Sequence, residues 1–187
     1  MKLKLIHEEY GENLYKLTIR NIKTYDDNSM EKLKKVIKIL TEGDKFYFEF
    51  VREDFFLEEE ELVKYRREVP QYLKKNGRYE VKLELDETRF RSIGFLPTNE
   101  ETYKQLLVLW KYFETLVFFN PSSTFSWQDF DKKFNRKKPE VPAIDFVKNK
   151  YTNSVFIKGH DGDNLVFIYD NDFDNSLIQD VMRFINS

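Results

Sequence analysis

Carboxylates concentrate near the C-terminal end of the sequence with no basic residue among them. Between residues 159 and 182 there is no Lys or Arg, and the acids are Asp161, Asp163, Asp170, Asp172, Asp174 and Asp180. Clustered carboxylates can hold a hard cation such as Ca²⁺, or they can attract a basic partner. These aspartates are therefore the first candidates for a functional site.

The alternate spacing of Asp170, Asp172 and Asp174 matches the start of a calcium-binding loop. Such a loop needs a glycine at its sixth position, where the chain turns, and a bidentate glutamate at its twelfth. The sequence has Asn175 and Val181 at these two positions. We therefore do not expect calcium to bind here.

A second metal site would combine the imidazole of His160 with the carboxylates of Asp161 and Asp163. The same residues around Gly162 are typical of a turn, because glycine permits a positive φ and aspartate bonds to its own backbone. We interpret the segment as a hairpin tip. Neither a metal nor another cofactor is expected.

Glu80, Val81 and Lys82 form a Glu-x-Lys pattern on a predicted strand and resemble half of the restriction-endonuclease-like nuclease core. The resemblance implies that the carboxylate would hold Mg²⁺ and the lysine would stabilise the attacked phosphate. That core also requires an aspartate on a neighbouring strand, for which Asp44 is the convenient candidate. Because a strand with one solvent-facing side yields this pattern by chance, a metal-dependent nuclease is the alternative hypothesis, and we assign no catalytic residue.

Several other chemistries lack the residues they need. The chain has no cysteine, which excludes disulfides, thiolate zinc sites and cysteine nucleophiles. Its two histidines, His7 and His160, lie outside any Gly-x-Ser-x-Gly element, so serine hydrolase chemistry is not expected. No Gly-x-Gly-x-x-Gly or phosphate-binding Gly-Lys-Ser pattern is present, which argues against nucleotide binding by those routes.

Aromatic residues lie next to a basic run, a combination that can bind nucleic acid by base stacking in a charged groove. The aromatic residues are Phe118, Phe119, Phe125, Trp127 and Phe130, and the basic ones are Lys132, Lys133, Arg136, Lys137 and Lys138. The helical spacing of Trp127, Phe130 and Phe134 predicts instead the buried stripe of a short helix. Nucleic-acid binding is therefore a second alternative.

The composition is that of a folded domain in water. The chain has 187 residues, of which 34% are charged, 41% hydrophobic and 17% aromatic, with 31 Lys and Arg against 33 Asp and Glu. This balance gives no overall attraction to nucleic acid or to an anionic membrane. No apolar stretch is long enough to span a membrane, and the N-terminus becomes acidic before a signal-peptide core develops, so a cytoplasmic location is expected.

The elements that must position the candidate residues follow from apolar periodicity. A hairpin is expected over residues 3–19 with Gly11 in its connection, and a helix over 30–40 with Ser29 as its N-cap. The further expected elements are a strand at 46–51, a helix at 58–77 broken near Pro70, a strand at 79–85, a central helix from a capping box at 98–101 through Val117, a short helix at 127–134, a hairpin at 155–169 and a final helix at 177–185.

Because the strands come in hairpin-like pairs, the pattern predicts an α+β fold with a mainly antiparallel sheet of about six strands. Residues 1–135 form the expected main domain, 136–142 a basic proline-containing linker, and 143–187 a C-terminal hairpin and helix packed on the same core. The central helix is expected to lie buried on the sheet. The expected contacts join Trp110, Phe113 and Leu106 to Phe48, Val81 and Leu83.

Without reaction machinery, the chain is best interpreted as a non-enzymatic protein-binding module. Carboxylates can occupy the groove of a basic nuclease in place of phosphate and speed association with it. We therefore expect an inhibitor or immunity protein that neutralises a basic, nuclease-like toxin. The expected partner-binding residues, placed together on one exposed face, are Asp161, Asp163, Asp170, Asp172 and Asp174.

Overall fold

The computed structural model describes residues 3–53, 60–84, 89–113, 115–134, 143–159 and 162–187. Within these ranges the chain forms an α+β domain with one eight-stranded antiparallel sheet and six helices. The strands are β1 (Lys4–Gly11), β2 (Leu14–Arg20), β3 (Lys45–Glu53), β4 (Arg78–Glu84), β5 (Arg89–Pro97), β6 (Thr115–Phe119), β7 (Ser154–Lys158) and β8 (Asn164–Asp170). The predicted fold class is confirmed.

The strand order across the sheet is β1-β2-β8-β7-β6-β3-β5-β4, and the sheet is open, with β1 and β4 at its edges. The C-terminal hairpin of β7 and β8 lies in the middle of this order, because β8 pairs with β2 and β7 pairs with β6. Residues far apart in the sequence are thereby brought together at the ends of these central strands.

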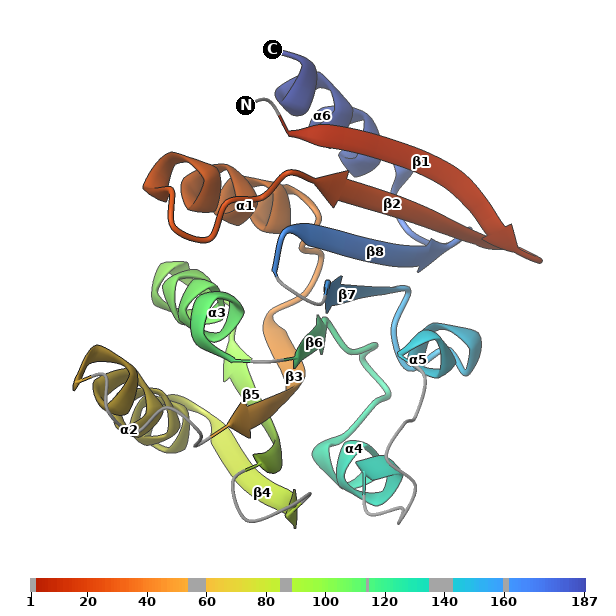
Figure 1. Cartoon of the computed structure of the whole chain (residues 1–187). Coiled ribbons are helices and arrows are strands. Elements are labelled where there is room, and N and C mark those ends of the chain that lie inside the picture. The colour runs from red at the N-terminus through yellow and green to blue at the C-terminus, as the bar shows by residue number, and fades with distance from the viewer. Residues whose placement is uncertain (1–2, 54–59, 85–88, 114, 135–142, 160–161) are drawn as a thin grey trace.

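The helices cover both faces of the sheet (Figure 1). They are α1 (Asp27–Ile39), α2 (Glu60–Asn76), α3 (Glu100–Tyr112), α4 (Trp127–Phe134), α5 (Ile144–Lys148) and α6 (Asn175–Asn186). One face carries α6, α1, α3 and α2 side by side, and the other carries α4 and α5. Two apolar cores therefore form, one on each side of the sheet.

The strands supply both cores by alternation. On β3, Phe46, Phe48 and Phe50 are buried in the core beneath α1 and α3, while Tyr47 is buried with α4 on the opposite face. Alternate side chains of a strand point to opposite faces, so a strand covered on both sides becomes almost continuously apolar. On β7, likewise, Phe156 lies in the same core as Phe46, and Val155 lies in the core on the opposite face.

The expected burial of the central helix is confirmed for Leu106, Trp110 and Phe113, each at most 2% exposed. The expectation is wrong for Val81, which is 50% exposed. The register between β4 and β5 shifts between Val81 and Leu83. Val81 precedes this shift and lies on β4, an edge strand of the sheet; beyond the shift, the regular alternation of faces does not continue along β4. The side chain of Leu83 lies outside the described residues.

Two strands and two helix details differ from the sequence expectation. β5 and β6 were not expected, and α3 ends at Tyr112 instead of continuing through Val117. Pro70 lies inside a continuous α2, where it removes one backbone donor but leaves the burial of Val69 and Leu73 in the core intact. The packing of the apolar face, and not local propensity, sets the length of that helix.

The helix caps also shift by one or a few residues. Asp26, not Ser29, is the N-cap of α1 and accepts the N–H of Asn28, while the Ser29 hydroxyl accepts the N–H of Lys23. Asn99 caps α3 by accepting the N–H of Thr102. Aspartate and asparagine are among the strongest N-cap residues, so each helix begins at its better acceptor.

Candidate functional site

The C-terminal end of β8 and the start of α6 hold the largest group of predicted site residues. We name Glu42, Asp170, Asp172 and Asp174 the acidic corner. Asp174 is the N-cap of α6, and its Oδ1 accepts the N–H of Ser176 at 2.8 Å. Hydrogen bonds from Ser176 hold the pKa of Asp174 below its usual range. The corner is therefore anchored to a strand end and a helix start.

Asp170 and Asp172 share one cation supplied by the chain itself. The Nζ of Lys150 lies 2.8 Å from Asp170 Oδ2 and 2.7 Å from Asp172 Oδ2. The hydrogen bonds to these two carboxylates raise the pKa of Lys150, which keeps its ammonium charged at neutral pH. Lys150 adopts a φ of 57° in the turn between α5 and β7, a backbone conformation that residues other than glycine rarely take.

The lysine ammonium stands between the first two of the alternately spaced aspartates, while the third caps a helix. The carboxylates of Asp170, Asp172 and Asp174 are thus not arranged around a common point for a calcium ion. In the ranges that the structure describes, no group of three or more His, Asp or Glu side chains could hold a metal ion.

Glu42 joins the corner from the end of α1, and the sequence analysis did not include it. Its Oε1 accepts the N–H of Asp174 at 3.3 Å. Partial burial raises the pKa of Glu42, and the nearby charges of Asp174 and Asp170 raise it further. No sequence signal links Glu42 to Asp174, because their contact depends on α1 packing beside α6.

The five predicted partner-binding aspartates do not share one exposed face. Asp170 is buried, with 3% of its surface exposed, whereas Asp172 and Asp174 are exposed. Asp163 lies beyond the opposite end of β8, about 20 Å away at the usual rise of a strand. Asp161 lies outside the described residues. The expected common face is therefore wrong, and only the pair Asp172 and Asp174 is both close together and exposed.

The hairpin tip near Asp163 is held against the helical layer. Gly162 has a φ of 70°, and its carbonyl accepts the indole N–H of Trp110 at 2.9 Å. The carbonyl of Asp163 accepts the N–H of Ile22 at 2.8 Å. This tip has a structural role that the turn interpretation of the sequence did not include.

The nuclease-like pattern does not assemble a metal site among the described residues. Glu80 accepts hydrogen bonds from Arg78 and Lys82, and Lys82 also pairs with Asp131 of α4. Glu80 on β4 and Glu49 on β3 both pair with Ile93 of β5, so the two glutamates lie at the same level of the sheet. Asp44 precedes Glu49 by five residues, which corresponds to about 17 Å along the strand direction. Asp44 and Glu80 therefore do not converge.

The aromatic residues beside the basic run form part of the second core. Phe125, Trp127 and Phe130 are at most 8% exposed. Phe125 and Phe130 pack against Phe119 and Phe146, and Trp127 packs against Phe130. They are not available for base stacking. Residues 136–142, the expected linker, lie outside the described residues.

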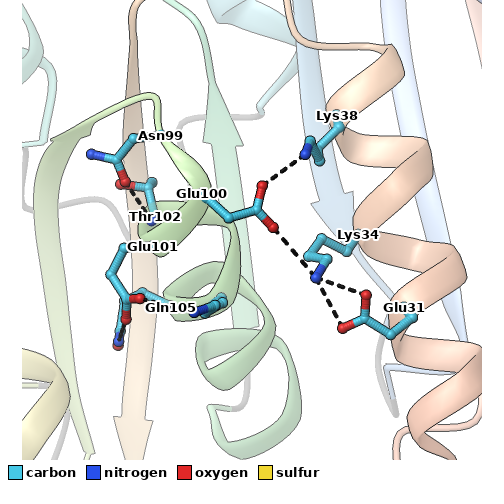
Figure 2. A network of polar contacts seen from close by, with 9 residues as sticks. Glu31, Lys34, Lys38, Asn99, Glu100, Glu101, Thr102 and Gln105 are labelled. Carbon is cyan, nitrogen blue, oxygen red and sulfur yellow. Dashed lines mark hydrogen bonds and ion pairs between the residues drawn. The ribbon is translucent and has the colours of Figure 1, made fainter.

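A second charged surface lies on the outer side of α1. Figure 2 shows Glu100, in the first turn of α3, reaching toward two lysines of α1. Its carboxylate lies 2.7 Å from Lys38 Nζ and 3.5 Å from Lys34 Nζ, and Lys34 also pairs with Glu31. These ion pairs tie α1 to α3.

Comparison with known proteins finds no matching family model, no matching curated protein and no matching solved structure. No helix in the described part of the chain is both long and apolar enough to cross a membrane.

Proposed function

We propose that the protein is a non-enzymatic binding module that docks against a basic surface of another protein through its acidic corner. The observation that carries the proposal is that Glu42 and Asp174 lie beside Asp170 and Asp172, and only the latter two are paired with a lysine, Lys150. One ammonium does not neutralise four carboxylates. The residual negative charge favours a cationic partner.

The exposed members of the corner support this use. The side chain of Asp172 is 65% exposed, and Asp174 and Glu42 are also exposed. Their backbone is fixed by the end of β8, the start of α6 and the Glu42 hydrogen bond. Carboxylates held on rigid elements bind with less loss of conformational entropy than those on a free loop.

The narrower hypothesis is that the partner is a basic, nuclease-like toxin and that the protein is its inhibitor or immunity protein. The chemical basis is that a row of carboxylates can substitute for phosphates in a cationic groove. Asp172 and Asp174 are the residues that we assign to this contact. The buried Asp170 pairs with Lys150 and so holds the lysine beside Asp172.

The charge hypothesis is tested with a defined cationic probe, a fluorescein-labelled dodecapeptide of lysine. In the triple variant Glu42→Gln/Asp172→Asn/Asp174→Asn we expect binding to weaken by about tenfold or more at low salt. The fold should persist for two reasons. Asparagine at position 174 can still cap α6, and glutamine at position 42 can still accept the backbone N–H of residue 174.

The matched control removes the same charge from separated exposed positions, in Glu9→Gln/Glu68→Gln/Asp180→Asn. We expect this variant to bind the lysine peptide within about twofold of the original protein. An equal loss in both triple variants would show that net charge, and not the acidic corner, governs binding. The toxin hypothesis is tested by mixing the protein with basic nucleases and measuring DNA cleavage, which the original protein should inhibit and Glu42→Gln/Asp172→Asn/Asp174→Asn should inhibit less.

A further inference from the structure

We propose that the groove over the outer face of α1 binds an acidic segment of a partner protein, at a site separate from the acidic corner. The groove has a volume of about 760 Å³ and is bordered by Phe184 of α6 and Glu100 of α3. This volume lies in the range of ligand-binding clefts. We name it the α1 groove; the residues of α1 that line it are Asn28, Glu31, Lys32, Lys34, Lys35, Lys38 and Ile39.

The charges of the α1 groove are unequal. Lys34 and Lys38 are paired with Glu31 and Glu100, and these ion pairs satisfy both carboxylates of the groove. Hydrogen bonding to Glu31, with smaller contributions from Glu100, raises the pKa of Lys34. Lys32 and Lys35 have no carboxylate within ion-pair distance among the described residues. The groove therefore keeps an excess of two positive charges.

One of these two lysines is held over an aromatic ring. The Nζ of Lys35 lies 4.3 Å from the centre of the Phe184 ring. A cation in this position is attracted by the ring face and loses part of its freedom. Phe184 and Ile39 are half-buried, so they add apolar surface between the ammonium groups. The combination suits a ligand that carries both carboxylates and apolar side chains.

The shape of the groove favours a peptide. It follows α1 from Asn28 to Ile39, about 17 Å at the usual helical rise, and it opens to solvent along that length. A short amphipathic segment can lie in such a groove with its apolar side chains toward the floor and its acids toward the lysines. Charge complementarity thus identifies the occupant as acidic and mixed in polarity.

Nucleic acid fits the same groove less well. Its cations are lysines, so no arginine fork is present for paired contacts with a phosphate. The Phe184 ring, the aromatic side chain in the lining, already has Lys35 over it, which removes a stacking surface for a base.

The probe is a fluorescein-labelled twelve-residue peptide in which leucine stands at every third position among glutamates, measured by fluorescence anisotropy at low salt. We expect it to bind, and we expect Lys32→Glu/Lys35→Glu to weaken binding tenfold or more. The matched control is Lys74→Glu/Lys75→Glu, which reverses two exposed lysines in the last turn of α2 and should leave binding within twofold.

Circular dichroism establishes that both double variants are folded. The proposal is overturned if the glutamate peptide does not bind, if both double variants weaken it equally, or if an oligothymidine of the same length binds more tightly than the peptide. It is also overturned if sedimentation shows a dimer of the original protein that Lys32→Glu/Lys35→Glu dissociates, since the occupant would then be a second copy of the chain. The acidic corner is unchanged in these variants, so the outcome does not depend on the proposed function.

Discussion

At the scale of single residues, Lys150 acts as an internal cation for the buried carboxylate of Asp170. Replacing Lys150 with Met leaves that carboxylate with its Asp172 N–H bond but without its ammonium partner. We expect the free energy of unfolding to fall by about 1–2 kcal/mol at neutral pH, below the value for a fully buried pair because the lysine side chain is 61% exposed. Urea denaturation measures the change.

The control for this variant is Lys148→Met, which removes an exposed lysine two positions earlier in the chain. We expect a change of less than about 0.5 kcal/mol there. In the double variant Lys150→Met/Asp170→Asn the loss should be smaller than the sum of the single losses, because the second change removes the unpaired charge. Simple additivity would contradict the pairing.

Glu42 gives a pH dependence of defined sign. Its pKa is raised in the folded protein, chiefly by burial, so the folded state binds a proton more readily than the unfolded state. Stability from this group therefore falls as the pH rises from the ordinary glutamate range through the raised pKa. We expect Glu42→Gln to increase stability at pH 7 by less than about 1 kcal/mol, because the side chain is only partly buried and water screens its charge.

The gain in free energy of unfolding from Glu42→Gln should be smaller at pH 4 than at pH 7 in the same urea denaturation, because at pH 4 Glu42 is itself protonated in the folded protein. Glu9→Gln, at an exposed carboxylate on the edge strand, should change stability little at either pH. A larger gain for Glu42→Gln at pH 4 than at pH 7 would contradict the direction of the pKa shift.

At the scale of elements, periodicity was sufficient where one pattern dominated. The alternating β3 and the amphipathic α1 and α6 form at the places that their sequences predict. The apolar run after Tyr112 satisfies helical and strand spacing together, and its β6 portion is fixed by pairing with β3 and β7. Whether this run forms a helix or a strand depends on pairing with strands that are distant in the sequence, so local spacing does not predict it.

Trp110 joins the helical layer to the central hairpin. It is fully buried, and its indole N–H donates to the carbonyl of Gly162. We expect Trp110→Ala to lower the free energy of unfolding by about 3–5 kcal/mol through loss of packing and the resulting cavity. A urea midpoint that corresponds to less than about 1 kcal/mol would contradict its central place in the core.

Trp110→Phe separates the two contributions. The ring keeps much of the packing, but the Gly162 carbonyl loses its donor, for which we expect a cost of about 1–3 kcal/mol. Amide hydrogen exchange should then increase at Ile22, whose N–H is bonded to the neighbouring Asp163 carbonyl. Equal stability of Trp110→Phe and the original protein would show that the hydrogen bond contributes nothing.

At the scale of the whole molecule, the sequence located three of the four carboxylates of the acidic corner, Asp170, Asp172 and Asp174. Asp172 and Asp174 are exposed as expected, whereas Glu42 and Lys150 enter through long-range contacts. Their positions depend on α1 lying antiparallel beside α6 and on the turn before β7. The spread of the aspartates to both ends of β8 likewise follows from the sheet, since a hairpin separates its tip from its base.

The two charged surfaces lie in sequence along α1. Lys32 and Lys35 lie near the middle of α1, and Glu42 follows its end, about 10–15 Å farther at the usual helical rise. This separation is comparable to or longer than the Debye length of about 8 Å in physiological salt. The net charge of −2 therefore conceals two local fields of opposite sign.

Local electrostatic fields of this kind change the rate at which a charged partner associates with the protein, even though the net charge is small. We expect the association rate of the lysine dodecapeptide, measured by stopped-flow fluorescence, to fall as salt is raised from about 50 to about 300 mM. For Glu42→Gln/Asp172→Asn/Asp174→Asn the rate should start lower and depend less on salt. For Glu9→Gln/Glu68→Gln/Asp180→Asn, which changes the net charge equally, it should keep the original rate and slope, because those carboxylates lie apart on the surface. If the two triple variants gave the same salt dependence, the acidic corner would not be the surface that attracts a basic partner.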